Sequence, residues 1–261
     1  TLKATNNLSN RNIIINGDFQ VAQRATSATT NSYSTVDRFA VGLNGSDETP
    51  TQAQHALTSS DTGPWEKGHR FSYHLTNGNQ TSGAGTQDYT FFYQNIEAQY
   101  LANSGWDYTS ASSYITLSFW IKSSVAQNFY GYLRTRDGTQ QSRPFETGAL
   151  SANTWTKITK VIPGNSNIQM DSDTGIGMGV YFTAFFGTHY TTDAKTVDTW
   201  SAYVNEERTP DQTSTWWTTN DATFEITGVQ LEVSDYATEF EHRTFQDEHL
   251  RWARYHQEQQ G

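Results

Sequence analysis

Acidic side chains occur in four close pairs that could supply acid–base chemistry. The pairs are Asp47 with Glu48, Asp171 with Asp173, Glu206 with Glu207, and Glu239 with Glu241. Glycoside hydrolysis needs two carboxyl groups about 5 to 10 Å apart, one protonated and one ionised. None of the pairs lies in a motif that fixes this geometry, and the chain has no GxSxG, HExxH or P-loop motif and no Cys. The sequence therefore predicts a protein that is not an enzyme.

Aromatic side chains in predicted loops could bind sugar, because flat rings shed water against the C–H side of a sugar ring while amides and carboxylates fix the hydroxyls. The alternative is that such rings fill the core or anchor loops and subunit contacts. The candidate ligand-binding residues are Trp65, Trp106, Tyr190, Trp200, Trp216 and Trp217.

The adjacent pair Trp216 and Trp217 stands out among these candidates. An extended chain turns only one of two neighbours inward, which leaves the other for a ligand or a subunit contact. By contrast, Trp120 and Trp155 lie inside strand patterns, and we expect both in the core.

Three histidines recur at seven-residue intervals: His242, His249 and His256. Along one helix this spacing separates neighbours by about 10.5 Å, too far for two of them to bind one ion. Only a symmetric trimer would bring copies together around an axis. We expect ordinary surface or packing roles for them. The segment 171–175 mimics the start of a calcium loop, but Phe182 stands where the closing Glu belongs, so we predict a turn.

The composition is polar but weakly charged. Mean hydropathy is −0.71, 17% of residues are charged and 14% are aromatic, and this combination argues against disorder. The formal net charge of −10 lowers affinity for phosphate backbones, so we expect no nucleic acid partner. No apolar run approaches the roughly 20 residues that span a bilayer, so we expect no membrane insertion. A sugar-binding surface is compatible with this charge.

Apolar and polar residues alternate along most of the chain, as half-buried strands require. The clearest run places Ile115, Leu117, Phe119 and Ile121 on one face. Similar runs occur at 39–43, 71–75, 89–93 and 179–186, with turn residues between them. The pattern predicts an all-β sandwich in a single domain, residues 1–261, with the sandwich itself at about 12–243.

Four local features depart from simple alternation. The apolar residues expected to face inward change from even-numbered to odd-numbered positions at Thr227 and Gly228, which predicts a β-bulge. Thr244 followed by Asp247 is a capping-box pattern and predicts a short C-terminal helix over 244–257. A shorter helix is predicted within 96–103. Residues 188–220 are polar and acidic, and we expect a long decorated loop there.

Several segments follow a pattern that spans most of the chain: NIIINGDFQVAQR at 12–24, TVDRF at 35–39, ITLSFWIKSS at 115–124, NTWTKITKVIPG at 153–164 and TGIGMGVYF at 174–182. ATFEITGVQLEVSDYATEFEHRTF at 222–245 and ARYHQ at 253–257 are its most specific parts. Together they resemble the sandwich modules of tail and fibre proteins of tailed bacteriophages, which are themselves similar to carbohydrate-binding modules.

The resemblance implies a jelly-roll β-sandwich of two antiparallel sheets in a virion tail or fibre, often homotrimeric, whose partners are host cell-surface glycan or other virion proteins. Related carbohydrate-binding sandwiches often hold a structural calcium ion near an NGDF-type strand. Asp18 matches that position, but Gln20 replaces the usual acid and weakens a site for a hard cation. Asp18 is thus a weak metal candidate, and no cofactor is expected.

Three hypotheses about function follow. The leading one is a virion tail or fibre module that contacts the host surface by binding glycan. The second is a purely structural virion protein that attaches to the capsid or tail and binds no host ligand. The third is a polysaccharide depolymerase, for which the sequence supplies no positive motif.

Overall fold

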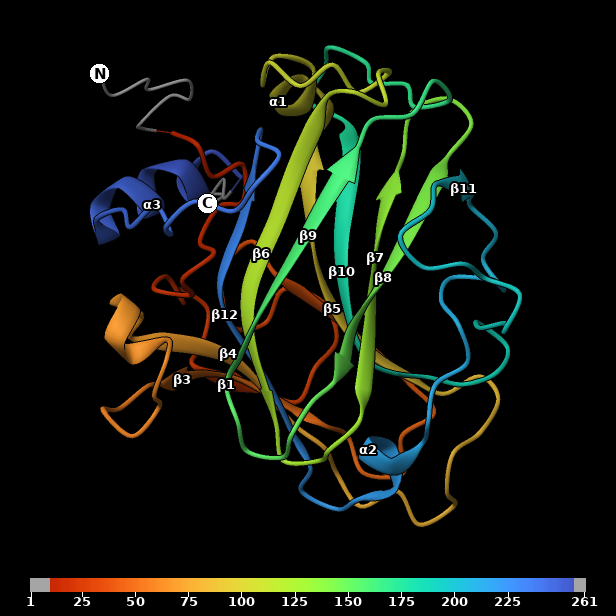
Figure 1. Cartoon of the computed structure of the whole chain (residues 1–261). Helices are drawn as coiled ribbons and strands as arrows, with labels where there is room; N and C mark the ends of the chain where they lie inside the picture. The colour runs from red at the N-terminus through yellow and green to blue at the C-terminus, as the bar shows by residue number, and fades with distance from the viewer. Residues whose placement is uncertain (1–9, 256–261) are drawn as a thin grey trace, which may run out of the picture.

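The computed structural model describes residues 10–255 and consists of two six-stranded antiparallel sheets packed face to face (Figure 1). In spatial order, sheet A contains β1 (Ser27–Ala28), β3 (Thr51–Ala56), β4 (Phe71–Thr76), β12 (Thr223–Glu232), β6 (Tyr114–Ser123) and β9 (Thr156–Pro163). Sheet B contains β11 (Ser201–Ala202), β8 (Gln141–Ala149), β7 (Asn128–Thr135), β10 (Ile176–Phe186), β5 (Tyr89–Glu97) and β2 (Ala40–Asn44). The predicted all-β jelly-roll sandwich is confirmed.

The helices of the described chain lie outside the two sheets: the 3-10 helix Trp65–Lys67, α1 (Ala98–Ala102), α2 (Thr215–Thr218) and α3 (Phe245–Ala253). The backbone N–H of Asp247 donates to Thr244 Oγ1 at 3.1 Å, so α3 begins at the predicted cap. It ends at Ala253, short of the predicted 257, and residues 256–257 lie outside the described residues. No helix within residues 10–255 is long and apolar enough to cross a membrane.

The core lies between the sheets and is rich in aromatic rings. Phe92 of β5 stacks on Phe182 of β10, with 5.1 Å between ring centroids, and Phe119 of β6 meets Phe182 edge-on at 5.0 Å. The four predicted inward residues of β6 are all buried. Burial of each such side chain stabilises the fold by about 1.5 to 3 kcal/mol.

The predicted β-bulge is confirmed. The register between β12 and β6 shifts between Thr227 and Gln230, and Gly228 has a φ of 62°. Glycine adopts this left-handed conformation without the cost that a side chain imposes. Because of the shift, Phe224 before the bulge and Leu231 after it are both buried in the core despite their different parity.

Trp120 and Trp155 do not lie in the core, so that prediction is wrong. The inner side of β6 is already filled by Phe119 and Ile121, so the intervening Trp120 turns to the outer side of sheet A. Trp155 precedes β9, where its indole N–H donates to Asp61 Oδ1 at 3.0 Å. Both tryptophans are half-buried.

Residues 188–220 form less of a free loop than predicted. They contain β11, which extends sheet B by pairing with β8, and α2, which closes one end of the sandwich (Figure 1). An isolated parallel β-bridge between Thr191 and Thr209 connects the beginning of this segment to its later part. The segment therefore has a defined shape beside the outer side of sheet B.

Candidate functional site

The outer side of sheet B carries a second cluster of apolar side chains, separate from the core. The alternation that turns Phe92 inward along β5 turns its odd-numbered aromatic residues outward. The register then pairs Tyr93 with Tyr181 on β10, and Tyr181 with Tyr132 on β7. We call this cluster the aromatic face, and its members are Tyr89, Phe91, Tyr93, Tyr132, Tyr181, Phe186, Tyr190 and Tyr203.

Three rings of the aromatic face are stacked across three strands. The Tyr181 ring lies 5.1 Å from that of Tyr93, at 20° between planes, and 4.4 Å from that of Tyr132, at 1°. Phe91 adds a further ring 5.8 Å from Tyr93. The strand register therefore sets out the rings side by side as one apolar surface.

The segment that follows β10 covers one end of this surface. The backbone N–H of Tyr203 donates to the carbonyl of Gln140 at 2.8 Å, and that of Arg208 donates to the carbonyl of Tyr190 at 2.9 Å. Tyr132 is only 1% exposed as a result, while Phe91 and Tyr93 on β5 stay half-buried. The accessible part of the aromatic face is therefore its β5 side.

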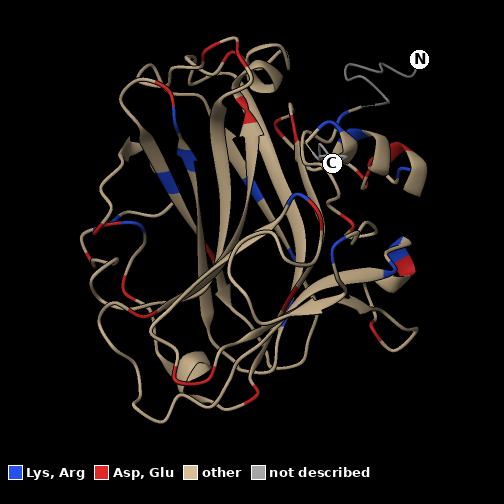
Figure 2. Ribbon diagram, turned by 180° about the vertical axis from the view of Figure 1, so that it is seen from behind, with Lys and Arg blue, Asp and Glu red and all other residues tan. Residues whose placement is uncertain are grey.

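Guanidinium groups flank the rings. The Arg134 guanidinium lies 3.5 Å from the Tyr203 ring centroid, and that of Arg208 lies 4.5 Å from the Tyr190 centroid. Figure 2 shows a basic position on each of β7 and β8, but only Arg134 of β7 lies on the side of the aromatic face, because Arg143 of β8 is opposite the core residue Leu133. The aromatic face thus combines apolar rings with donors held rigidly by stacking.

Burial controls the ionisation of the phenols. It raises the pKa of Tyr93 and of Tyr181, and it raises that of Tyr132 well above the ordinary value. These hydroxyls are therefore protonated at neutral pH and can both donate and accept hydrogen bonds. Burial lowers the pKa of Arg134, which still carries its charge at neutral pH. Rings, neutral hydroxyls and guanidinium groups together suit a polyhydroxylated ligand with an apolar side.

Trp216 and Trp217 are fully buried, so neither can offer a ring face to an outside ligand. Their indole N–H groups donate to the carbonyls of Thr223 and Gly83, at 3.1 and 2.9 Å. The prediction assumed an extended chain, whereas α2 is a helical turn that packs both rings inward. Trp106 is likewise buried, and its indole N–H donates to the Ser113 carbonyl at 3.2 Å. For these three tryptophans the prediction of a ligand contact is wrong.

The other predicted residues lie nearer the surface. Trp65 is half-buried in its 3-10 helix, with the Arg70 guanidinium 3.9 Å from its ring centroid. Trp200 donates from its indole N–H to the Pro163 carbonyl at 2.8 Å. Within residues 10–255 neither tryptophan makes a ring contact with the aromatic face, whereas Tyr190 belongs to it, 5.4 Å from Tyr89 and 5.8 Å from Phe186.

The sequence analysis missed the residues of β5, β7 and β10 in the aromatic face. A usable signal was present in the runs Phe91-Phe92-Tyr93 and Tyr181-Phe182. Consecutive aromatic residues in a strand place rings on both sides of the sheet. The outward rings then require either a cover or a ligand.

Asp18, the predicted metal candidate, is buried beside His69 and close to the more exposed His242. Its Oδ1 is 2.5 Å from His69 Nδ1, and its Oδ2 is 3.7 Å from His242 Nδ1. Burial acts to raise the Asp18 pKa, but hydrogen bonding to His242 and His69 outweighs it and the pKa is lowered. The same contact with Asp18 raises the pKa of His242. Gln20 also approaches Asp18, with Nε2 3.5 Å from Oδ2.

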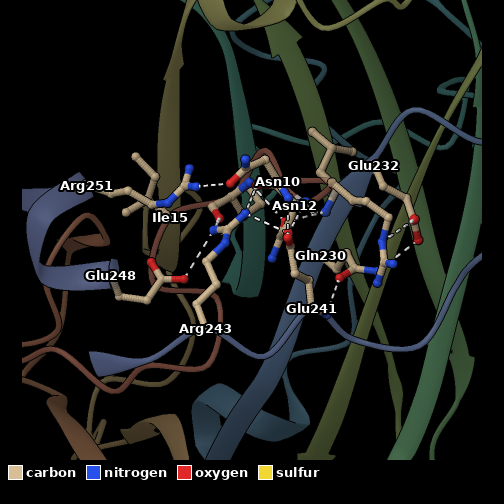
Figure 3. Close-up of polar contacts among 12 residues, drawn as sticks. Asn10, Asn12, Ile15, Gln230, Glu232, Glu241, Arg243, Glu248 and Arg251 are labelled. Atoms are coloured by element: carbon tan, nitrogen blue, oxygen red, sulfur yellow. Dashed lines mark hydrogen bonds and ion pairs between the residues drawn. The ribbon is translucent and has the colours of Figure 1, made fainter. Parts of the chain in front are cut away.

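A polar network joins the two ends of the described chain (Figure 3). Arg243 donates to the carbonyl of Asn12 at 2.5 Å, to Glu241 at 2.8 Å and to Glu248 at 3.2 Å. Glu248 in turn accepts the backbone N–H of Asn16 at 2.7 Å. The network fixes α3 and the segment before it against the start of the sandwich, so its role is structural.

A cavity of about 690 Å³ lies between this network, α1 and α3. Its wall includes Arg11, Tyr100, Glu232, Arg251 and Arg254. None of the predicted site residues lines it. With one aromatic residue and several ion-paired groups, this wall lacks the ring surface that the aromatic face provides.

Comparison with known protein families finds no match, and no curated protein matches the chain. Among solved structures, the enzymatically active domain of bacteriophage CBA120 tailspike protein 4 is 12% identical, with a TM-score of 0.42 over 85% of this chain, which spans 21% of that protein. The N-terminal cellulose-binding domain of Cellulomonas fimi β-1,4-glucanase C is 8% identical (TM-score 0.37; 84% of this chain and 99% of that one). A family 11 carbohydrate-binding module of Clostridium thermocellum is 11% identical, with a TM-score of 0.35 over 80% of this chain and 95% of that one. At these values the similarities identify neither a ligand nor an activity.

Proposed function

We propose that this chain is a non-catalytic module of a virion tail or fibre that contacts the host surface by binding glycan on the aromatic face. The observation that carries the proposal is the pair of partly exposed rings on β5, Phe91 and Tyr93, which the buried Tyr181 and Tyr132 support by stacking on the outer side of sheet B. Half-buried Phe91 and Tyr93 leave ring surface for the C–H side of a sugar. The virion location rests on the resemblance of the sequence segments quoted above.

The acidic pairs support a module without hydrolytic activity. Seven of their eight carboxylates are exposed. The eighth, Glu241, is bound to Arg243 at 2.8 Å, and Asp47 accepts hydrogen bonds from Ser82. A hydrolytic pair needs one carboxyl in an apolar setting that keeps it protonated at neutral pH. The exposed carboxylates have no such setting.

Exposed apolar side chains near the C-terminal helix favour the second candidate, attachment to another virion protein or to further copies in a homotrimer. Tyr236, Phe245 and Leu250 are 54%, 51% and 63% exposed. Phe245 and Leu250 both lie on α3, and large apolar side chains that stay exposed on one element suit contact with another protein. Sedimentation equilibrium of the full chain measures the oligomeric state directly, and a species of three chains is expected.

A glycan array tests the leading proposal. Wild type and a Trp65→Ala control are expected to retain the same sugars, while Phe91→Ala with Tyr93→Ala removes them. Tyr93→Phe keeps the ring and is expected to retain most of the binding. Equal retention by wild type and by the double variant would exclude the aromatic face. If wild type retains no sugar, attachment within the virion is the better account.

A further inference from the structure

The outer side of sheet A carries a cluster of two histidines and one glutamate on three adjacent strands. The register places His74 of β4 opposite Glu225 of β12, and Glu225 opposite Lys122 of β6. His55 of β3, on the far side of β4, reaches the same carboxylate. The side chains of Glu225, His74 and His55 are 4%, 17% and 49% exposed, so the cluster opens to solvent on the His55 side.

The separations between these groups match the ligand set of a tetrahedral ion. His55 Nδ1 lies 3.2 Å and His74 Nδ1 lies 3.3 Å from the same oxygen, Glu225 Oε2. One ligating atom from each residue falls within 4.8 Å of the other two. In a tetrahedral zinc site with bonds of about 2.0 Å, neighbouring ligand atoms are about 3.3 Å apart. Two of the three separations already have that value.

Neighbouring side chains orient the cluster. His74 Nε2 lies 3.0 Å from Thr76 Oγ1, whereas its Nδ1 is buried and makes no hydrogen bond within the described chain. When Nε2 carries the proton and donates to Thr76, Nδ1 directs its lone pair toward the Glu225 carboxylate. Histidines that bind metals are oriented by this kind of second hydrogen bond. Two facing acceptors repel one another unless a proton or a cation lies between them.

The net charge of the cluster and its neighbours favours binding of a cation. Lys122 Nζ lies 3.0 Å from the other carboxylate oxygen, Glu225 Oε1, and 2.9 Å from Asp61 Oδ1. One ammonium is thus shared by two carboxylates. With both imidazoles neutral, Lys122, Glu225 and Asp61 together carry one net negative charge. Lys122 binds Oε1. Oε2, the oxygen that both histidines face, accepts a hydrogen bond from Ser72 Oγ at 3.1 Å and keeps a second lone pair for an ion.

We propose that His55, His74 and Glu225 bind a divalent transition metal ion of the zinc type, with the fourth position open to solvent. Two imidazole ligands favour such an ion over calcium, which prefers oxygen ligands. The Asp18 cluster is less suited, because 2.5 Å between Asp18 Oδ1 and His69 Nδ1 is a hydrogen-bond distance and too short for two ligands of one ion. The ion would join β3, β4 and β12.

Titration of metal-stripped protein with Zn²⁺, followed by calorimetry, tests this site, and Co²⁺ reports its geometry through visible absorption. We expect one Zn²⁺ per chain and a tetrahedral Co²⁺ spectrum. Loss of a second-shell partner typically weakens affinity 10- to 100-fold, so Glu225→Gln is expected to weaken it by more than about 100-fold. Binding is expected to strengthen as the pH rises, because the imidazoles must lose their protons.

The control is His242→Gln, which alters the Asp18 cluster and is expected to leave Zn²⁺ affinity unchanged. His55→Asn changes a half-exposed side chain on β3 and tests the site even if Glu225→Gln fails to fold. Absence of saturable Zn²⁺ binding by wild type would overturn the proposal. Loss of binding in His242→Gln together with unchanged binding in His55→Asn would assign the ion to the other cluster. Neither result bears on glycan binding by sheet B.

Discussion

The outer sides of the two sheets differ sharply in chemistry although they arise from the same alternation. Outward positions of sheet B stack tyrosine rings, as in Tyr93, Tyr181 and Tyr132. Outward positions of sheet A link ionisable groups in a row across the strands, from His74 through Glu225 to Lys122. The inner sides of both sheets form the core, so the outward positions of each sheet can carry a separate binding chemistry.

The difference between the two sides also shows how each is held rigid. On sheet B, rings and guanidinium groups stack, with Arg134 3.5 Å from the Tyr203 centroid. On sheet A, Glu225 holds its neighbours by hydrogen bonds and charge, including Ser72 Oγ at 3.1 Å. Apolar contacts are insensitive to pH, whereas contacts within the row of ionisable groups depend on it. We therefore expect loss of a ring to affect sheet B most, and a change of pH or of a charged side chain to affect sheet A most.

The largest change in the free energy of unfolding is expected for Tyr181→Ala, because this ring lies in the centre of the stack and is 6% exposed. Truncation of a buried aromatic side chain lowers the free energy of unfolding by about 3 to 5 kcal/mol. Tyr181→Phe keeps the stack and should cost far less. Urea denaturation of both variants measures the difference, and a loss below about 1 kcal/mol for Tyr181→Ala would show that the stack contributes little to stability.

Zinc should stabilise the protein through sheet A alone. An ion present at 100 times its dissociation constant adds about 2.7 kcal/mol to the free energy of unfolding. Thermal melts with and without Zn²⁺ are expected to show this gain in wild type and in Tyr93→Ala, but not in Glu225→Gln. A gain that survives in Glu225→Gln would place the ion elsewhere.

Glycan affinity should depend on sheet B alone. Tyr93→Ala removes a half-buried ring from the accessible side of the aromatic face and is expected to weaken binding about tenfold, or about 1.4 kcal/mol. Glu225→Gln serves as the matched change on the opposite side and should leave this affinity unaltered. Surface plasmon resonance with a sugar retained on the array compares the two variants.

The smallest effect concerns the acid response of sheet A. Burial acts to raise the pKa of Asp61, but hydrogen bonds from Trp155, Thr58 and Lys122 outweigh it and lower the pKa to about 2. A lowered folded pKa adds stability above the unfolded value, near 3.9, and this stability is lost as the pH falls toward 2. Asp61→Asn should therefore cost about 0.2 to 1 kcal/mol at pH 7. Chemical denaturation at pH 7, 4 and 2 should show the difference from wild type shrinking with acidity.

Much of the fold could be predicted because its signals are local. The alternation at Ile115 to Ile121, the parity change at Gly228 and the cap at Thr244 each follow from neighbouring residues in the chain. All three are confirmed by the structure. The predicted loop at 188–220 was partly wrong, because the pairing of β11 with β8 depends on residues about 60 positions apart.

The candidate site was harder to predict, because it depends on strand register and on which side each ring faces. Trp216 and Trp217 were chosen for their residue type, but a helical turn buries both. Tyr132 and Tyr181 are 49 residues apart and stack only because β7 and β10 are neighbours. Similarly, His55, His74 and Glu225 meet only through the pairing of three strands. No local spacing encodes either arrangement.

The most direct test of the central claim, that glycan binds the aromatic face, is NMR titration of the labelled protein with a sugar selected on the array. The proposal predicts shift changes concentrated on the ring signals of Phe91, Tyr93 and Tyr190, with Trp65 and Trp155 unmoved. Shift changes concentrated at Trp65, or on the outer side of sheet A, would contradict it.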